Sequence, residues 1–119
     1  LPALVKASRI QDKVSGVGFD WEEPQQVFEK LKEELEELQH EVTEDNQDLI
    51  EAEFGDVLFS MINYARFLRV NPENALERTN KKFIKRFQYL EQKAKQQGKA
   101  LADMTLTEMD VYWNEAKML

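Results

Sequence analysis

The feature that most constrains the fold is a pair of helix-periodic segments separated by a short polar turn. In the segment 24–42, five apolar residues recur at intervals of four, four, three and four: Val27, Leu31, Leu35, Leu38 and Val42. This spacing predicts one buried seam on an amphipathic helix. The segment 48–69 predicts a second helix, and the short connection between the two favours antiparallel neighbours. We therefore expect the chain to be organised around a helical hairpin.

The second of these helices is apolar on nearly all sides from Phe54 to Leu68. A helix of this kind is buried over most of its surface, and in so small a chain part of that burial is expected to come from a second subunit. One polar line interrupts it at intervals of three, four and three residues: Glu53, Asp56, Ser60 and Asn63. Burying ionised carboxylates without a partner costs several kcal/mol each. We therefore expect this stripe to face a cation or a wet cleft.

Three further helices complete an all-α fold, a bundle of about five helices. They are expected over residues 2–14, from Pro72 to about Gln97, and from Thr105 onward. Pro72 suits the first turn of its helix, and Gly98 suits the position just after the last turn of the same helix. Thr105 and the glutamate three residues later have the spacing of a capping box.

The composition excludes several classes of protein. The net charge of −7 argues against a generic nucleic-acid binder, which needs a basic surface. The absence of cysteine excludes disulfides and thiolate metal sites. No apolar run approaches the roughly 20 residues that span a bilayer, so we expect a cytoplasmic protein with neither a membrane nor a nucleic-acid partner. We expect one domain over residues 1–119, and because the first residue is Leu rather than Met, a fragment of a longer chain.

Carboxylates from both helices of the hairpin are spaced to meet at one place. Glu34 and Glu37 are three residues apart on the first helix, and Glu53 and Asp56 are three apart on the second. Residues at this spacing share one side of a helix. Crowded carboxylates repel unless they are protonated or share a cation, and a ligand set made only of oxygen selects Mg²⁺ or Mn²⁺. We expect such an ion here, with a polyphosphate as its further ligand.

Three motifs taken together resemble a known family. They are the acidic set Glu33, Glu34, Glu37, Glu53 and Asp56, the upstream Gly18-Phe19-Asp20-Trp21, and the later run from Asn80 to Phe87 with Trp113 and Lys117 beyond it. The chain resembles the MazG nucleoside triphosphate pyrophosphohydrolases over nearly its whole length, and is most similar to the C-terminal catalytic domain of the two-domain bacterial members. One departure is Ala52, where the family often has a second acid before the glutamate of the second motif.

The resemblance implies an all-α homodimer that hydrolyses a nucleoside triphosphate to the monophosphate and pyrophosphate. It implies Mg²⁺ as cofactor, with Mn²⁺ as an alternative, and a metal-activated water that attacks the α-phosphorus. The implied metal ligands are Glu34, Glu37, Glu53 and Asp56. Glu33 would be a further ligand or the base that orients water. The residues implied to reach phosphate oxygens or line the nucleotide pocket are Lys30, Lys82, Arg86, Trp113 and Lys117.

Other functions stay open at this point. The chain fits a non-catalytic helical domain for dimerisation or regulation with a degenerate site. It also fits a relative in the same superfamily that prefers dUTP, dCTP or a phosphoribosyl-ATP. Intact carboxylates at all four matching positions argue against the first alternative.

Individual motifs also have structural interpretations. A run of glutamates on a helix is by default a solvated face, and the basic run 81–86 is by default a surface cluster. Phe19 and Trp21 are expected to anchor their loop more than to stack on a base, and Trp113 fits either role. Glu37 and His40 imitate half of a di-iron motif, but a single histidine cannot complete that site within one chain. We therefore expect His40 to be exposed.

Overall fold

The computed structural model describes residues 2–119, which are helical apart from turns and loops. The elements are α1 (Ala3–Ser15), α2 (Pro24–Glu44), α3 (Gln47–Phe67), α4 (Pro72–Gln96), the short 3₁₀ helix η1 (Leu101–Asp103) and α5 (Leu106–Lys117). No strand occurs among these described residues. The expected all-α fold of five helices is confirmed, and each expected helix end lies within two residues of the observed one.

The chain divides into two compact units. The first reaches Glu73 and contains α1, α2 and α3, and the second runs from Asn74 to Leu119 and contains α5 and nearly all of α4. The single domain expected over residues 1–119 stays a prediction. Across residues 2–119, none of the helices combines the length and the apolar character needed to cross a bilayer.

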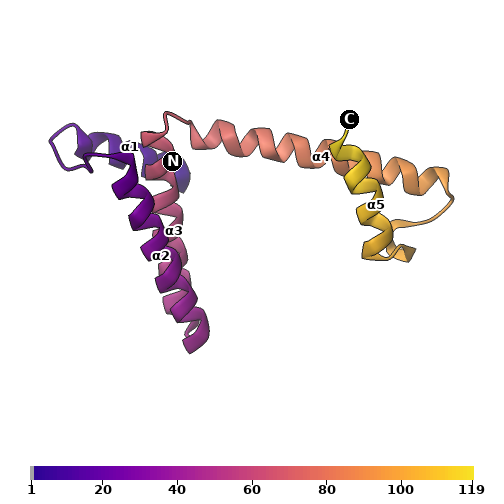
Figure 1. The fold of residues 1–119 in the computed structure, drawn as a ribbon, viewed down its shortest axis with the longest axis horizontal. Helices are drawn as coiled ribbons and strands as arrows, with labels where there is room; N and C mark the ends of the chain where they lie inside the picture. Colours follow the sequence, from indigo (N-terminus) through magenta and orange to yellow (C-terminus); the bar gives the residue numbers. More distant parts are fainter. Residues whose placement is uncertain (1) are drawn as a thin grey trace. The chain divides into compact units, whose positions relative to one another are not determined.

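Helices α2 and α3 form the hairpin that the sequence predicts. They lie side by side and run in opposite directions (Figure 1). After α2, Asp45 adopts a left-handed conformation with φ 56°, and Asn46 caps α3 by accepting a hydrogen bond from the Leu49 N–H at 3.2 Å. This two-residue connection brings the middle of α2 opposite the first half of α3.

The buried seam of α2 differs from the predicted one. Val27 and Leu31 are buried as expected, but Leu35 and Val42 are 46% and 48% exposed. The next buried position after Leu31 is Glu34, which is only 6% exposed. Burial at intervals of four and then three residues is the narrow seam of two packed helices. The prediction was wrong at Leu35 because it assigned burial by apolar character alone.

Helix α3 is buried on one side within the chain. Val57, Ser60 and Ile62 are buried. The large apolar residues on another face are each 48–52% exposed: Phe54, Leu58, Met61 and Leu68. The described residues therefore bury less of α3 than its sequence led us to expect.

Asp20 holds the loop between α1 and α2 against α3. Its carboxylate accepts two hydrogen bonds from the Arg66 guanidinium, at 2.6 and 2.9 Å, and one from the Ser15 hydroxyl at 2.6 Å. Hydrogen bonds from Arg66 are the main cause of a lowered pKa of Asp20, which falls to about 2. Charge-assisted bidentate pairs of this kind fix geometry strongly.

The two aromatic residues that flank Asp20 do not anchor the loop. Phe19 is 79% exposed and Trp21 is 44% exposed. Gly18 lets the chain turn ahead of them with a φ of 91°, a conformation that glycine adopts without strain. The loop is therefore held by the aspartate, and not by the aromatic side chains that the sequence favoured as anchors.

In the second unit, α5 packs against α4. Leu90 and Ala94 of α4 and Ala116 of α5 are buried. The Tyr89 hydroxyl donates to the Glu115 carboxylate at 2.8 Å, which joins the two helices. Buried apolar side chains and a hydrogen bond thus fix the pair.

Two sequence expectations for this unit have different outcomes. Thr105 and Glu108 form the predicted capping box at the start of α5, so this helix begins where its local signal places it. Leu76 and Phe83, which were expected on the buried side of α4, are 51% and 56% exposed, so that part of the prediction is wrong among the described residues.

Replacing Asp20 by Asn should lower the free energy of unfolding by about 1–2 kcal/mol at neutral pH, because a charge-assisted pair is lost. The pKa of Asp20 is about 2 in the fold and 3.8 ordinarily. The contribution of the Asp20 charge to the free energy of unfolding is therefore complete above about pH 4, and it disappears as the pH falls through 2. Urea unfolding at pH 7 and near pH 2 measures the difference. Asp110→Asn, on the exposed surface, is the control, and an equal effect of Asp20→Asn at both pH values would contradict the account.

Candidate functional site

Helices α2 and α3 bring three carboxylates together. Glu34, Glu37 and Glu53 each offer one oxygen atom, and these three atoms lie within 4.8 Å of one another. Glu34 is buried, Glu53 is half-buried and Glu37 is exposed. The antiparallel register of the hairpin produces this meeting, since residues one turn apart on α2 face the start of α3. We refer to these three residues as the carboxylate cluster.

Asp56, the fourth predicted metal ligand, lies beside the carboxylate cluster rather than within it. It lines a cavity of about 250 Å³ whose wall also includes Lys30 and Glu34. Ser60 and Asn63 of α3 line the same cavity. Three residues of the polar stripe, Asp56, Ser60 and Asn63, therefore line one cavity together with Lys30 and Glu34 of α2, whereas Glu53 belongs to the carboxylate cluster.

Two oxygen atoms of the carboxylate cluster are buried without a partner. Glu34 Oε2 and Glu53 Oε2 receive no hydrogen bond from the described residues. Burial raises the pKa of Glu53, and the negative charges of Glu37, Asp56 and Glu34 raise it further. A divalent cation supplies both the missing charge and the missing partner. Carboxylate oxygens are the ligands that Mg²⁺ and Mn²⁺ prefer, so these residues fit such an ion.

Lys30 is the basic residue that contacts this acidic site in the described part of the chain. Its ammonium group lies 3.0 Å from Glu34 Oε1 and 3.5 Å from Glu33 Oε1. The hydrogen bond to Glu34 is the main cause of a raised pKa of Lys30. One ammonium group cannot balance three carboxylates, so the site keeps a net negative charge. Lys30, predicted to contact phosphate, thus lies at the edge of the carboxylate cluster.

An open cavity of about 400 Å³ lies on the exposed side of the carboxylate cluster. Its lining is almost entirely acidic: Glu33, Glu36, Glu37, His40, Glu41 and Glu53. Glu33 is exposed there, next in sequence to Glu34, and can accept a proton from a molecule in this cavity. His40 is exposed, as predicted, and does not belong to the carboxylate cluster.

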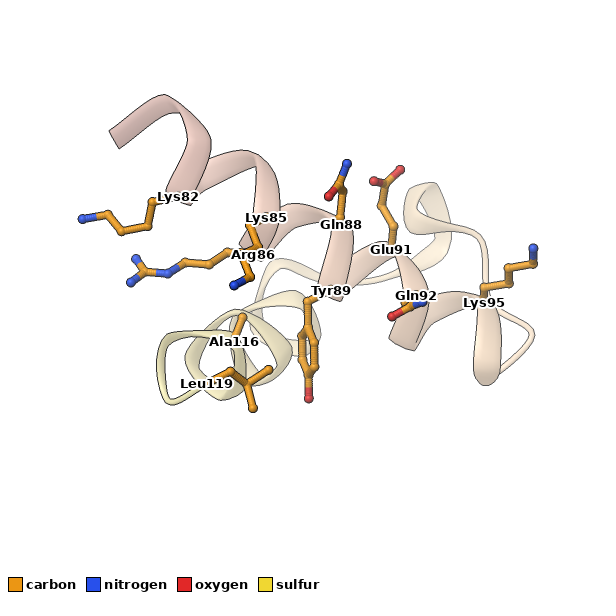
Figure 2. A pocket seen from close by; sticks show the side chains of 10 residues that line it. All are labelled: Lys82, Lys85, Arg86, Gln88, Tyr89, Glu91, Gln92, Lys95, Ala116 and Leu119. Carbon is orange, nitrogen blue, oxygen red and sulfur yellow. The ribbon is translucent and has the colours of Figure 1, made fainter. Parts of the chain in front are cut away.

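Two of the predicted phosphate-binding residues line a groove in the second unit. The groove has a volume of about 790 Å³, and its lining includes Lys82, Lys85, Arg86 and Lys95 of α4. Figure 2 shows Lys82 and Arg86 extending in the same direction from neighbouring turns of the helix. Two cations that project together in this way suit an anionic ligand.

Trp113 and Lys117 do not line this basic groove. The Trp113 ring lies 4.9 Å from the Phe83 ring at an angle of 55°, which joins α5 to α4. Lys117 is exposed at the end of α5. Their role in binding a nucleotide stays a prediction.

The sequence analysis missed an aromatic cavity in the first unit. Its volume is about 420 Å³, and α1, α3 and the loop between α1 and α2 contribute to its wall. Trp21, Phe59 and Asn63 line both this cavity and the one that holds Lys30 and Glu34. The only sequence signal was the pair of aromatics in the loop, since the contribution of α3 depends on tertiary packing.

Comparison with known proteins gives a family match across the carboxylate cluster. The family described as MazG nucleotide pyrophosphohydrolase domain matches residues 22–90. The matched stretch includes all five predicted acids together with Lys30, Lys82 and Arg86, whereas Trp113 and Lys117 lie outside it. The resemblance inferred from the motifs is thereby confirmed.

Three curated relatives extend this comparison. The chain is 45% identical over 117 residues to the nucleoside triphosphate pyrophosphohydrolase/pyrophosphatase MazG of Thermotoga maritima, a match that covers 98% of this chain and 45% of the relative. It is 36% identical over 119 residues to the nucleoside triphosphate pyrophosphohydrolase of Escherichia coli K12, with the same coverage. It is 56% identical over 68 residues to the uncharacterized protein YabN of Bacillus subtilis, covering 57% of this chain and 14% of YabN. The chain spans about half the length of the first two relatives.

Adding Mg²⁺ should raise the melting temperature of the protein, because a ligand held only by the folded state stabilises it by about 1.4 kcal/mol at ten times its Kd. Glu53→Gln should be as stable as the wild type or more stable without metal, since carboxylate repulsion is relieved. In this variant, Mg²⁺ should also raise the melting temperature much less than it does in the wild type. Differential scanning fluorimetry with and without EDTA measures both effects.

The control for this measurement is Glu51→Gln, an exposed position on the same helix that should leave the response to Mg²⁺ intact. If Glu53→Gln instead unfolds the protein, and Mg²⁺ does not change the melting temperature of the wild type, the role of Glu53 is structural.

Proposed function

Because this chain belongs to the MazG nucleotide pyrophosphohydrolase domain family, we propose that it hydrolyses a nucleoside triphosphate between the α- and β-phosphates, using Mg²⁺. The products are a nucleoside monophosphate and pyrophosphate. The observation that carries this proposal is the carboxylate cluster, with three ligand atoms within 4.8 Å and two buried oxygens lacking a partner. The Thermotoga and Escherichia relatives are named for the same reaction, which supports the proposal.

The residues of the first unit supply a site for the charged end of the substrate. Glu34, Glu37 and Glu53 would hold the cation, and Asp56 would complete its surroundings from the adjoining cavity. Bound Mg²⁺ neutralises phosphate charge and activates water as a nucleophile. Lys30 would donate a hydrogen bond to a phosphate oxygen, and Glu33 would take the proton of the attacking water.

The basic groove of the second unit fits a further part of this role. Lys82 and Arg86 project together, and we assign them to phosphate oxygens of the substrate. Trp113 and Lys117 are assigned to substrate binding on the strength of the motif alone. A triphosphate carries about four negative charges, so a cation and several basic side chains are needed to hold it.

We also propose that the protein is a homodimer. Phe54, Leu58, Met61 and Leu68 form an apolar face on α3 that the described chain leaves about half exposed. Their intervals of four, three and seven residues place them on one side of the helix. Apolar faces of this kind mark surfaces that pack against a partner. A cytoplasmic location, with no nucleic-acid or membrane partner, remains a prediction.

The direct test is an assay of pyrophosphate release from a mixture of nucleoside triphosphates, with Mg²⁺ and with EDTA. We expect release only with the metal, and none from Glu53→Gln. A complete absence of release from the wild type would favour the non-catalytic alternative. Release from dUTP, dCTP or a phosphoribosyl-ATP alone would identify the more specific relative.

Lys82→Ala should raise the KM for a nucleoside triphosphate about tenfold, the effect of removing one charged hydrogen bond of about 1.4 kcal/mol. Steady-state kinetics with the preferred substrate measures this change. The matched control is Lys81→Ala, an exposed neighbour that does not line the basic groove. Unchanged KM and kcat in Lys82→Ala would remove this residue from the site.

Leu58→Lys should shift the protein from dimer to monomer, because a charge would be placed within the apolar face of α3. Size-exclusion chromatography with light scattering measures the molar mass. Val17→Lys, at an exposed apolar position in the loop after α1, should leave the mass unchanged. A wild-type protein that is already monomeric would contradict the dimer.

A further inference from the structure

The aromatic cavity and the cavity beside the carboxylate cluster adjoin each other. Both belong to the first unit, and Trp21, Phe59 and Asn63 contribute to both walls. The first cavity is aromatic, and Lys30 and Glu34 line the second. A volume of about 420 Å³ for the aromatic part lies in the range of small-molecule sites. A ligand with a planar apolar end and a charged end matches this arrangement.

The backbone of Trp21 is held in place while its ring stays accessible. Trp21 is 44% exposed, and its backbone N–H donates to Asp20 Oδ1 at 2.8 Å. Asp20 is in turn fixed by Arg66. An accessible ring on a fixed backbone is a platform on which a nucleobase can stack, an interaction that tolerates every base.

Asn63 adds a group that can distinguish one base from another. Its Oδ1 accepts hydrogen bonds from Arg66 Nε at 3.2 Å and from a terminal guanidinium nitrogen at 2.9 Å. Arginine has only donors, so the oxygen of the amide must be the atom that faces it. The amide nitrogen of Asn63 has no hydrogen-bond partner among the described residues, and Asn63 lines both cavities, so this donor is available to a bound molecule.

Gln11 of α1 supports the wall of the aromatic cavity. It is 3% exposed, and its Nε2 donates to the Phe59 carbonyl oxygen at 2.9 Å. This hydrogen bond joins α1 to α3 at Phe59, which lines the same cavity.

We propose that the aromatic cavity receives the nucleobase of the substrate, and that Asn63 favours a base that carries a carbonyl oxygen. This inference rests on the proposed function and adds the base subsite to it. Guanine and adenine make the sharpest comparison, because guanine has a carbonyl oxygen at the position where adenine has an amino group. The donor of Asn63 therefore prefers guanine.

The test compares GTP and ATP as substrates of the full chain. We expect the wild type to prefer GTP in kcat/KM about fivefold, the effect of one neutral hydrogen bond. Asn63→Asp keeps an acceptor for Arg66 but replaces the donor by a second acceptor. It should reverse the preference toward ATP, whose amino group can donate. If Asn63→Asp lowers kcat/KM equally for GTP and ATP, the assignment of Asn63 is overturned, since a nonspecific charge effect does not distinguish the bases.

Trp21→Ala tests the stacking platform separately. It should raise the KM for both substrates about tenfold, in line with base–aromatic stacking, and leave inhibition by inorganic tripolyphosphate unchanged. Val17→Ala, in the same loop but outside the cavity, is the matched control. Unchanged KM in Trp21→Ala together with normal hydrolysis would overturn the base subsite and leave the proposed function standing.

A binding measurement on the wild type makes the test independent of turnover and of the folding of any variant. In ¹⁵N-labelled protein without metal, GMP should shift the side-chain amide signals of Asn63 and the indole signal of Trp21, and AMP should shift the Asn63 signals less. Inorganic tripolyphosphate should shift neither. If GMP leaves both signals in place, the base subsite is wrong. Shifts with GMP in a protein that releases no pyrophosphate would instead support the subsite and refute the proposed reaction.

Discussion

A carboxylate in the buried seam of a helical hairpin is the constraint on which the rest of this structure depends. Glu34 occupies a position that packing alone would give to an apolar residue. Its side chain is held by Lys30 on one oxygen, while the other is buried without a partner beside Glu53. An isolated buried charge is costly, so the hairpin is stable to the extent that positive charge balances this group. A cation bound at this cluster would therefore stabilise the first unit.

The remainder of the first unit serves to hold this arrangement rigidly. The two-residue connection between α2 and α3 sets the register that brings Glu37 opposite Glu53. The pair formed by Asp20 and Arg66 joins the loop after α1 to α3, and the same arginine orients Asn63. Functional groups that project from packed helices are positioned more precisely than groups on free loops. The cation site and the proposed base subsite share this single framework.

Much of the helical organisation could be predicted because its signals are local. The capping residues Thr105 and Glu108, and Pro72 at the start of α4, are read from a few adjacent residues. The meeting of Glu34, Glu37 and Glu53 agrees with the prediction made from acids three residues apart on two antiparallel helices, whereas Asp56 lies beside the cluster. The family resemblance rested on these same acids and is confirmed by the match over residues 22–90.

The features that escaped prediction depend on contacts between residues far apart in the sequence. Nothing near Glu34 indicates that it, rather than Leu35, enters the seam, since the choice is made by the rotation of α2 against α3. Asp20 and Arg66 are 46 residues apart, so the anchor of the loop carried no local signal. The free donor of Asn63 has the same origin, because it exists only once Arg66 has occupied the oxygen of that amide.

The most direct test of the account is a titration of the protein with Mn²⁺ in place of Mg²⁺, in which electron paramagnetic resonance measures the free ion. We predict that the protein binds Mn²⁺ at a saturable site and that added Mg²⁺ displaces the bound Mn²⁺. Glu34→Gln and Glu53→Gln should each abolish Mn²⁺ binding, whereas Glu51→Gln should not. Mn²⁺ that stays free in the presence of the wild type, or that binds equally to all these variants, would contradict a cation site built on the carboxylate cluster.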